Sequence, residues 1–334
     1  MALAGYPLKY DFGDATAEAR ACRTACALFD FSFLECARLD GARARSVIET
    51  FAGRPMAALA EKEIFYALRT GGAGEVIADW TVWRTGANSF EVMSGRREDV
   101  IDLLACAGTD LEITDLAEGR AVFAVQGPDT LGALRKLGAT RVIEELKYFK
   151  FERADIAGIP CTVGRLGYTG EAGVEIIVER RHASTLWTAL AVHAAPAGFI
   201  AADMLRIEAG FVLFTQELRL PVAPRELGLE QFARAINAPK PEIRLVSFRA
   251  EADRLSWPWR PPRALQRPTR PGMIAVTSAC ESVAAGGILG LGYVLAGTLP
   301  DTPLQDSMGT FRNVRVTPKP FHDTAKQRHR AFWR

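Results

Sequence analysis

Residues 166–178 read Leu-Gly-Tyr-Thr-Gly-Glu-Ala-Gly-Val-Glu-Ile-Ile-Val, a glycine-punctuated turn that runs into a series of β-forming residues. The apolar run predicts a buried strand, and three glycines in seven residues let the backbone approach a ligand closely. Glu175 starts this strand, so its carboxylate is expected to have a rigid mount on which both oxygens accept from adjacent N–H donors. The alternative is a glycine-rich hairpin whose acids are solvated.

This segment resembles the Tyr-Thr-Gly-Glu-x-Gly-x-Glu signature of the aminomethyltransferase (glycine-cleavage T-protein) family. Other segments resemble family landmarks in the family's order and span most of the chain: Phe29-Asp30-Phe31-Ser32, Gln126-Gly127-Pro128, residues 205–210, Gln216-Glu217, residues 224–229 and Val276-Thr277-Ser278. The resemblance implies an α+β fold, with a folate-binding body of mixed sheets and helices around a central channel. It places that body in residues 1–240, as two interleaved subdomains with the inner one about 52–115, and a small β-barrel domain in residues 241–334.

Bulk composition excludes several classes of protein. The chain has 334 residues, 49% of them hydrophobic, which is enough for two or three domains with a sizeable core. Its net charge of +2 gives no overall field that would recruit nucleic acid or an anionic membrane. No secretory signal or membrane-spanning run is visible, so we expect a cytoplasmic protein with six reduced cysteines. The four histidines lack ligand spacing, so no metal site is expected.

The C-terminal segment from Phe311 to Arg334 differs from the rest, because seven basic side chains there face the single acid Asp323. We expect a solvated terminal tail. The alternative is a contact with the polyglutamate of a folate or with an acidic protein partner.

Cap and turn residues predict the order of elements. Asp14 or Thr16 is expected to cap a helix through about Ala27, and a helix over 41–49 is expected to stop at Gly53. A strand, a glycine turn and a helix recur over 121–137, which predicts an internally duplicated body. The other predicted elements are strands at 80–83 and 90–93, a helix at 98–106, a hairpin over 149–165, helices at 181–193 and 201–214, and an irregular connection over 256–271.

Asp79 falls at the second aspartate of the family's Gly-Gly-x-x-Asp-Asp segment, and Ala78 replaces the first. The resemblance implies that Asp79 is the catalytic carboxylate, which hydrogen-bonds a folate nitrogen and steers proton transfer. At the start of an apolar strand it is expected to be partly desolvated, and the loss of the first carboxylate should ease its ionisation. The alternative is a turn residue before a strand.

The resemblance also implies which residues hold folate. Glu175 is expected to accept from the 2-amino group and N3–H of the pterin, and Tyr168 to stand beside it and donate one hydrogen bond. Arg206 is expected to help bind folate, since Ala202 stands where the family has a folate-binding arginine. Phe90 completes the expected cofactor contacts. The alternatives are core packing for Tyr168 and a surface ion pair with Glu208 for Arg206.

The activity implied is tetrahydrofolate-dependent transfer of a one-carbon group, aminomethyl or methyl. The donor is either a lipoyl-carrying protein or a small molecule. Five departures from the family, at Phe33, Ala78, Trp80, Ala202 and Thr215, change the expected cavity and favour a donor other than the lipoyl arm. The alternatives are a folate-dependent demethylase of a small methylated compound and a non-catalytic folate-binding or regulatory paralogue.

Overall fold

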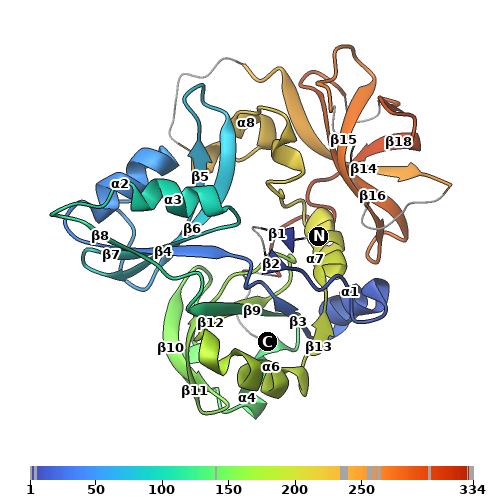
Figure 1. Cartoon of the computed structure of the whole chain (residues 1–334). Coiled ribbons are helices and arrows are strands. Elements are labelled where there is room, and N and C mark those ends of the chain that lie inside the picture. The colour runs from blue at the N-terminus through green and yellow to red at the C-terminus, as the bar shows by residue number, and fades with distance from the viewer. Residues whose placement is uncertain are drawn as a thin grey trace.

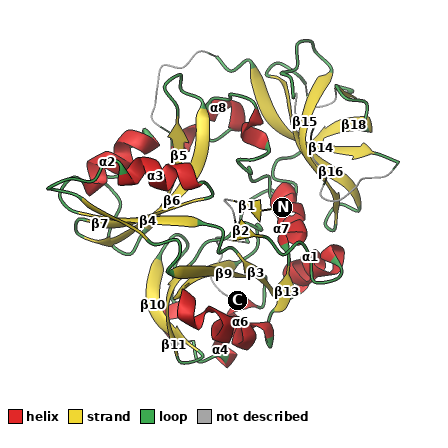
Figure 2. Cartoon of the chain, viewed as in Figure 1, coloured by secondary structure: helices red, strands yellow, loops and turns green. Residues whose placement is uncertain are grey.

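The computed structural model describes residues 2–3, 6–139, 141–233, 240–253, 259, 261, 265–299, 302–328 and 330. Three lobes make up the molecule, and each is built on one main sheet (Figure 1). The first two lobes carry helices on one face of their sheets, whereas the third is almost entirely strand (Figure 2). The α+β fold expected from the sequence is therefore confirmed, with strands outweighing helices.

The first two sheets repeat one topology. The first sheet has the order β5-β6-β7-β4-β8, and the second has the order β10-β11-β12-β9-β3-β13. The two orders correspond once β3, which lies between β9 and β13, is left out. In each lobe the chain then forms a strand, a helical segment, three antiparallel strands, a further helix and a last strand. This repeat bears out the predicted duplication.

The elements of these two lobes have the following bounds. The first lobe contains β4 (Glu35–Asp40), α2 (Ala44–Ala52), β5 (Ile64–Thr70), β6 (Val76–Gly86), β7 (Ser89–Ser94), α3 (Arg97–Leu104) and β8 (Glu112–Asp115). The second contains β3 (Ala27–Asp30), β9 (Arg120–Gln126), α4 (Thr130–Lys136), α5 (Arg141–Glu144), β10 (Phe151–Ile156), β11 (Ile159–Gly164), β12 (Gly173–Glu179), α6 (Ala183–Ala191) and β13 (Ala195–Ala197).

The C-terminal lobe is a half-barrel with the strand order β17-β15-β16-β14-β18. An isolated bridge between Leu304 and Val314 brings its two edges together. The β-barrel domain expected after residue 240 is present in this open form. Its strands are β14 (Ile243–Glu251), β15 (Met273–Ser282), β16 (Gly287–Leu295), β17 (Gln305–Asp306) and β18 (Arg312–Thr317).

Helices α1 (Ala15–Thr24) and α7 (Phe199–Glu208) lie between the second lobe and the half-barrel (Figure 1). Asp14 caps α1 as predicted, since its carboxylate accepts from the backbone N–H groups of residues 16 and 17. Every residue of α7 is buried. This helix ends at Glu208 and not near 214 as predicted, because Gly210 takes a φ of +72° and packs against Lys319 and Pro320. Short elements complete the chain: β1 (Ala2–Leu3), β2 (Tyr6–Pro7), η1 (Arg180–His182), η2 (Glu217–Arg219), α8 (Pro224–Leu227) and η3 (Glu230–Phe232).

The segment that follows Phe311 is only partly the solvated tail that was predicted, because Val314 and Pro320 are buried while the described residues from Thr324 onward are exposed. This segment forms β18 and then folds back on the body, where the backbone N–H of Phe321 and that of His322 donate to the Glu208 carbonyl. Lys319 is part of the same packing, because its ammonium donates to the carbonyl of Leu227. Arg334 and residues 256–258, 260 and 262–264 of the predicted irregular connection over 256–271 lie outside the described residues.

Candidate active site

One hydrophobic core is shared by all three lobes, and the carboxylates of Glu175 and Asp79 face it. In β12, Val174, Ile176 and Val178 pack under α4 and α6, while Ile177 packs in the shared core. Because side chains alternate along a strand, Glu175 points with Ile177 toward the shared core. In β6, Trp83 belongs to the shared core, and the same alternation puts Asp79 on its side of the sheet.

Glu175 is a buried carboxylate with no protein partner among the described residues. It is 7% exposed, and no hydrogen bond or ion pair joins its oxygens to another described side chain. Burial raises its pKa to about 7 from an ordinary 4.5, since nothing offsets the loss of water around the charge. Its neighbours across the sheet are Ala124 and Gly164, and the Trp83 ring and the Leu166 side chain occupy the space over Gly164.

Asp79 has one described side-chain partner, the Tyr66 hydroxyl, which donates to its Oδ2 at 3.2 Å. The two residues come from neighbouring strands, since β5 and β6 pair Tyr66 with Thr81 and Leu68 with Asp79. Asp79 is half-buried, and the loss of water around its carboxylate raises its pKa to about 6, while the Tyr66 hydrogen bond opposes this rise. A carboxylate with a pKa near 6 exchanges a proton readily around neutral pH.

Three tyrosines stand around these carboxylates. The Asp79 charge adds to burial in raising the pKa of both Tyr66 and Tyr168, and the Glu175 charge does the same for Tyr148. All three rings are surrounded by protein, yet each keeps some accessible surface. The three tyrosines therefore lie close to the two carboxylates, at positions that are neither fully buried nor fully exposed.

The structure places Tyr168 with Asp79 and not beside Glu175 as the sequence predicted. Its hydroxyl donates to the Val212 carbonyl, and its ring stacks on Phe211 at 5.9 Å between centroids. The described neighbour of Glu175 is Tyr148, from the loop before β10.

Arg206 is expected from the sequence to bind folate, but its guanidinium is engaged in hydrogen bonds and ion pairs with other residues of the protein. Nε and Nη2 contact the Asp203 carboxylate, Nη1 contacts Glu217 and the Phe211 carbonyl, and Nη2 also donates to Ser278. The side chain is fully buried, and Asp203 and Glu217 are nearly so. All three guanidinium nitrogens are therefore engaged, and Arg206 fastens α7 to the half-barrel instead of contacting a ligand.

We expect Arg206→Gln to destabilise the protein by about 3–5 kcal/mol, because it leaves two buried carboxylates without a counter-charge. Urea unfolding followed by circular dichroism measures the loss. Arg141→Gln is the matched control, since the ion pair that Arg141 makes with Glu145 is exposed and its loss should change stability little. Equal midpoints for the two variants would contradict the structural role of Arg206.

The comparisons with known proteins agree with this architecture. Residues 4–236 match the family model described as the GCVT N-terminal domain. The chain belongs to the GCVT family. An aminomethyltransferase of Streptomyces coelicolor is 29% identical over 298 residues, which cover 86% of this chain and 78% of that protein. An aminomethyltransferase of Thermoanaerobacter pseudethanolicus is 31% identical over 241 residues, which cover 69% of this chain and 65% of that protein.

A solved structure shows the same fold. It is described as the glycine cleavage system aminomethyltransferase T from Bartonella henselae, and it superposes with a TM-score of 0.76 at 20% identity. The match covers 100% of this chain and 95% of that one, so all three lobes belong to the shared fold.

Two of the departures from the GCVT pattern, Ala78 and Trp80, lie on the face of the first sheet opposite Asp79. Phe90, which the sequence predicted to contact the cofactor, lies on that face too. Phe90, Trp80 and Ala78 are buried in the core under α2 and α3, opposite the face that carries Asp79. The Trp80 indole N–H donates to Asp99 at 2.7 Å. Phe90 is therefore a core residue, and Ala78 and Trp80 point away from the face that carries Asp79.

Of the other departures, Ala202 lies in the shared core and Phe33 packs against it, whereas Thr215 is only partly buried. Phe33 packs edge-on against Phe31 and Phe199, and Ala202 is 2% exposed near the start of α7. Thr215 carries a buried hydroxyl that has no hydrogen-bond partner in the described structure. An unpaired buried hydroxyl is costly, so Thr215 is the departure most plainly in need of a ligand or water.

Sequence reasoning missed a buried cluster of charged residues behind the Tyr-Thr-Gly-Glu turn. Arg23 of α1 contacts Glu208 of α7 at 2.7 Å and Glu171 of the turn at 3.1 Å. His322 of the C-terminal segment also contacts Glu171, at 2.6 Å. Four segments far apart in the sequence thus fix the turn that leads into β12, and no local pattern could have revealed their meeting.

The described residues offer neither a metal centre nor a membrane span. No group of three or more His, Cys, Asp or Glu side chains is placed to hold a metal ion in that part of the chain. Within the same residues, no helix is both long and apolar enough to cross a membrane.

Proposed function

We propose that this chain is a tetrahydrofolate-dependent one-carbon transferase of the aminomethyltransferase type. The observation that carries the proposal is Glu175, a carboxylate buried in the core between the lobes without a partner among the described residues. An unpaired buried carboxylate is costly, and it is retained where a ligand supplies the missing donors. The names of the curated relatives, which are aminomethyltransferases, agree with this proposal.

The residues present fit a pterin. Its 2-amino group and ring N–H are adjacent donors, which match the two oxygens of Glu175 in a bidentate contact. When the ring binds, the donors favour the ionised form of Glu175, so its pKa should fall from about 7.

Asp79 and Tyr66 would act at the reacting end. Bound tetrahydrofolate supplies a nucleophilic nitrogen that accepts the one-carbon group. Asp79 accepts a hydrogen bond or a proton from the ligand, and Tyr66 donates to Oδ2 and so orients the carboxylate. Most of the rate should come from positioning of the ligand.

The donor divides the proposal into two versions. An aminomethyl group carried on a lipoyl arm is the version suggested by the relatives, with the lipoyl-carrying protein as partner. A small methylated amine or ether is the version suggested by Phe33, Ala202 and Thr215, the departures that do not lie in the core under α2 and α3. A partner that contacts the basic C-terminal segment stays a prediction.

One experiment decides between the versions. The protein is incubated with tetrahydrofolate and either an aminomethylated lipoyl carrier, with ammonia release as the readout, or a panel of methylated amines and ethers, with one-carbon folates as the readout. The departures predict slow ammonia release and turnover of at least one small donor. Fast ammonia release, with no one-carbon folate formed from any of the methylated amines and ethers, would support aminomethyl transfer from the lipoyl carrier. If neither ammonia nor a one-carbon folate forms but folate binds tightly, the result would instead support a non-catalytic folate-binding protein.

A further inference from the structure

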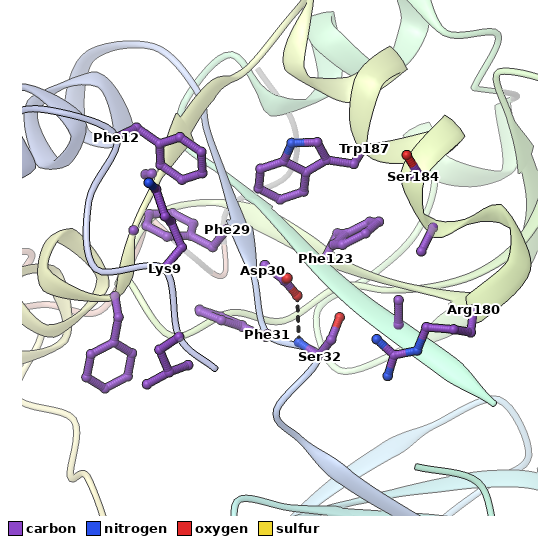
Figure 3. Close-up of a pocket in the computed structure, with 16 residues that line it drawn as sticks. Lys9, Phe12, Phe29, Asp30, Phe31, Ser32, Phe123, Arg180, Ser184 and Trp187 are labelled. Atoms are coloured by element: carbon purple, nitrogen blue, oxygen red, sulfur yellow. Dashed lines mark hydrogen bonds between the residues drawn. The ribbon is translucent and has the colours of Figure 1, made fainter. Parts of the chain in front are cut away.

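A separate cavity of about 390 Å³ opens at one edge of the second sheet (Figure 3). It exists because β13 ends at Ala197, so that Asp30 and Ser32 have no strand beside them on that side. Helix α6 and the loop over residues 8–12 close the space around this gap. Neither Glu175 nor Asp79 lines the cavity, so it is distinct from the proposed folate site.

Six aromatic rings contribute to its wall, those of Phe12, Phe29, Phe31, Phe123, Trp187 and Phe199. The Trp187 indole lies between Phe123, at 5.2 Å between ring centroids, and Phe12, at 6.1 Å (Figure 3). Phe29 and Phe31 supply the wall from β3 and the residue after it. Such a wall favours a flat ring, because aromatic pairs prefer stacked or edge-on contact at these separations.

The polar groups at this cavity are mainly donors. Among the described residues, no hydrogen-bond or ion-pair partner is found for the Lys9 ammonium, the Ser184 hydroxyl or the Trp187 indole N–H, and Lys9 only overlies the Phe12 ring at 5.4 Å. The Asp30 carboxylate already accepts from the Ser32 backbone N–H at 2.9 Å. A ligand that brings a negatively charged acceptor is therefore favoured over one that brings a donor.

The wall is held in place before any ligand arrives. The Lys9 carbonyl accepts from the Phe199 N–H at 2.9 Å, and the Tyr10 carbonyl accepts from the Ile200 N–H at 3.0 Å. The loop that carries Lys9 and Phe12 is thus fastened to the start of α7. A site fixed in this way loses little freedom when it binds.

We propose that this cavity binds a small aromatic carboxylate, with its ring among Trp187, Phe123 and Phe29 and its carboxylate at Lys9. The volume falls in the range of small-molecule sites, roughly 300–1,000 Å³, and suits a one- or two-ring acid. The inference does not rest on the proposed folate chemistry.

Titration calorimetry of the full chain with 2-naphthoate tests the proposal, beside its neutral amide and octanoate as probes. We expect saturable binding of 2-naphthoate and at least tenfold weaker binding of the other two. Lys9→Gln should weaken 2-naphthoate by about tenfold and leave the amide unchanged, because one charge-assisted contact is lost. Ala183→Leu should block the space without removing a polar group, since Ala183 lines the cavity. Lys136→Gln, on the exposed end of α4, is the matched control and should bind normally.

Three results would overturn the proposal. The first is absence of saturable heat with 2-naphthoate at millimolar concentration. The second is equal affinity for the acid and its amide, which would remove the role of Lys9. The third is loss of 2-naphthoate binding in Glu175→Gln, which would assign the ligand to the folate site.

Discussion

Glu175→Gln is expected to weaken tetrahydrofolate binding about a hundredfold or more and, at the same time, to stabilise the free protein above pH 7. The loss of affinity follows because glutamine replaces one of two charged acceptors with a donor that opposes the ligand's own N–H groups. Removal of a charge-assisted bidentate contact costs roughly 2–4 kcal/mol in a desolvated site. Few other single substitutions should separate binding from stability so cleanly.

The stability gain follows from the raised pKa. Below about pH 4.5 the carboxyl is protonated in both the folded and the unfolded chain, so Glu175 costs nothing. As the pH rises from about 4.5 to 7, the unfolded chain ionises first and the folded state is progressively disfavoured. Above pH 7 the full penalty applies, on the order of 3 kcal/mol, and the neutral glutamine avoids it.

Calorimetry with tetrahydrofolate and urea unfolding at pH 5 and pH 8 measure the two effects. Glu179→Gln is the matched control, because Glu179 ends the same strand but is exposed and pairs with Arg181. It should change neither quantity appreciably. If Glu175→Gln bound folate as the wild type does, Glu175 would not be the pterin anchor.

Asp79→Asn is expected to retain folate affinity within a few-fold while turnover falls by about 10²–10⁴. The amide keeps the size of the carboxylate and can still meet the Tyr66 hydroxyl, but it cannot take a proton. In the wild type the rate should fall as the pH drops through about 6, because protonation removes the ionised carboxylate. That limb of the pH profile should vanish in the variant.

The measurement is single-turnover kinetics, with the donor identified by the assay above, from pH 5 to pH 8. Asp155→Asn is the control, since Asp155 is an exposed aspartate on β10 in the other lobe. Turnover close to that of the wild type in Asp79→Asn would make Asp79 an ordinary strand residue.

Local chemistry predicted much of this fold. Asp14 caps α1 and Gly53, with a φ of +58°, ends α2, both as the sequence indicated. The strand that carries Glu175 was also predictable, because a β-branched run after glycines has few other outcomes. The side of the sheet on which each residue lies could also be predicted from the sequence. Asp79 and Trp80 are adjacent in one strand and must face opposite sides, so the alternation of side chains alone excludes Trp80 from the face that carries Asp79.

Contacts between distant segments were not predictable. The pairing of Tyr66 with Asp79 depends on the register of β5 against β6, which hydrophobic pattern and turn residues do not fix for a single pair. The burial of Arg206 depends on Glu217 and Ser278, which arrive from two other elements. An arginine on a helix looks the same in sequence whether it meets solvent, a ligand or a buried acid.

The most direct test of the central claim is calorimetric titration of the wild type with tetrahydrofolate near pH 6.5, in two buffers of different ionisation enthalpy. Because free Glu175 has a pKa of about 7 and must be ionised to hold the pterin, binding should release protons. We predict saturable binding with release of more than about half a proton per folate, and no release in Glu175→Gln. Binding without proton release would contradict the role of Glu175, and absence of binding at millimolar folate would contradict the proposed function itself.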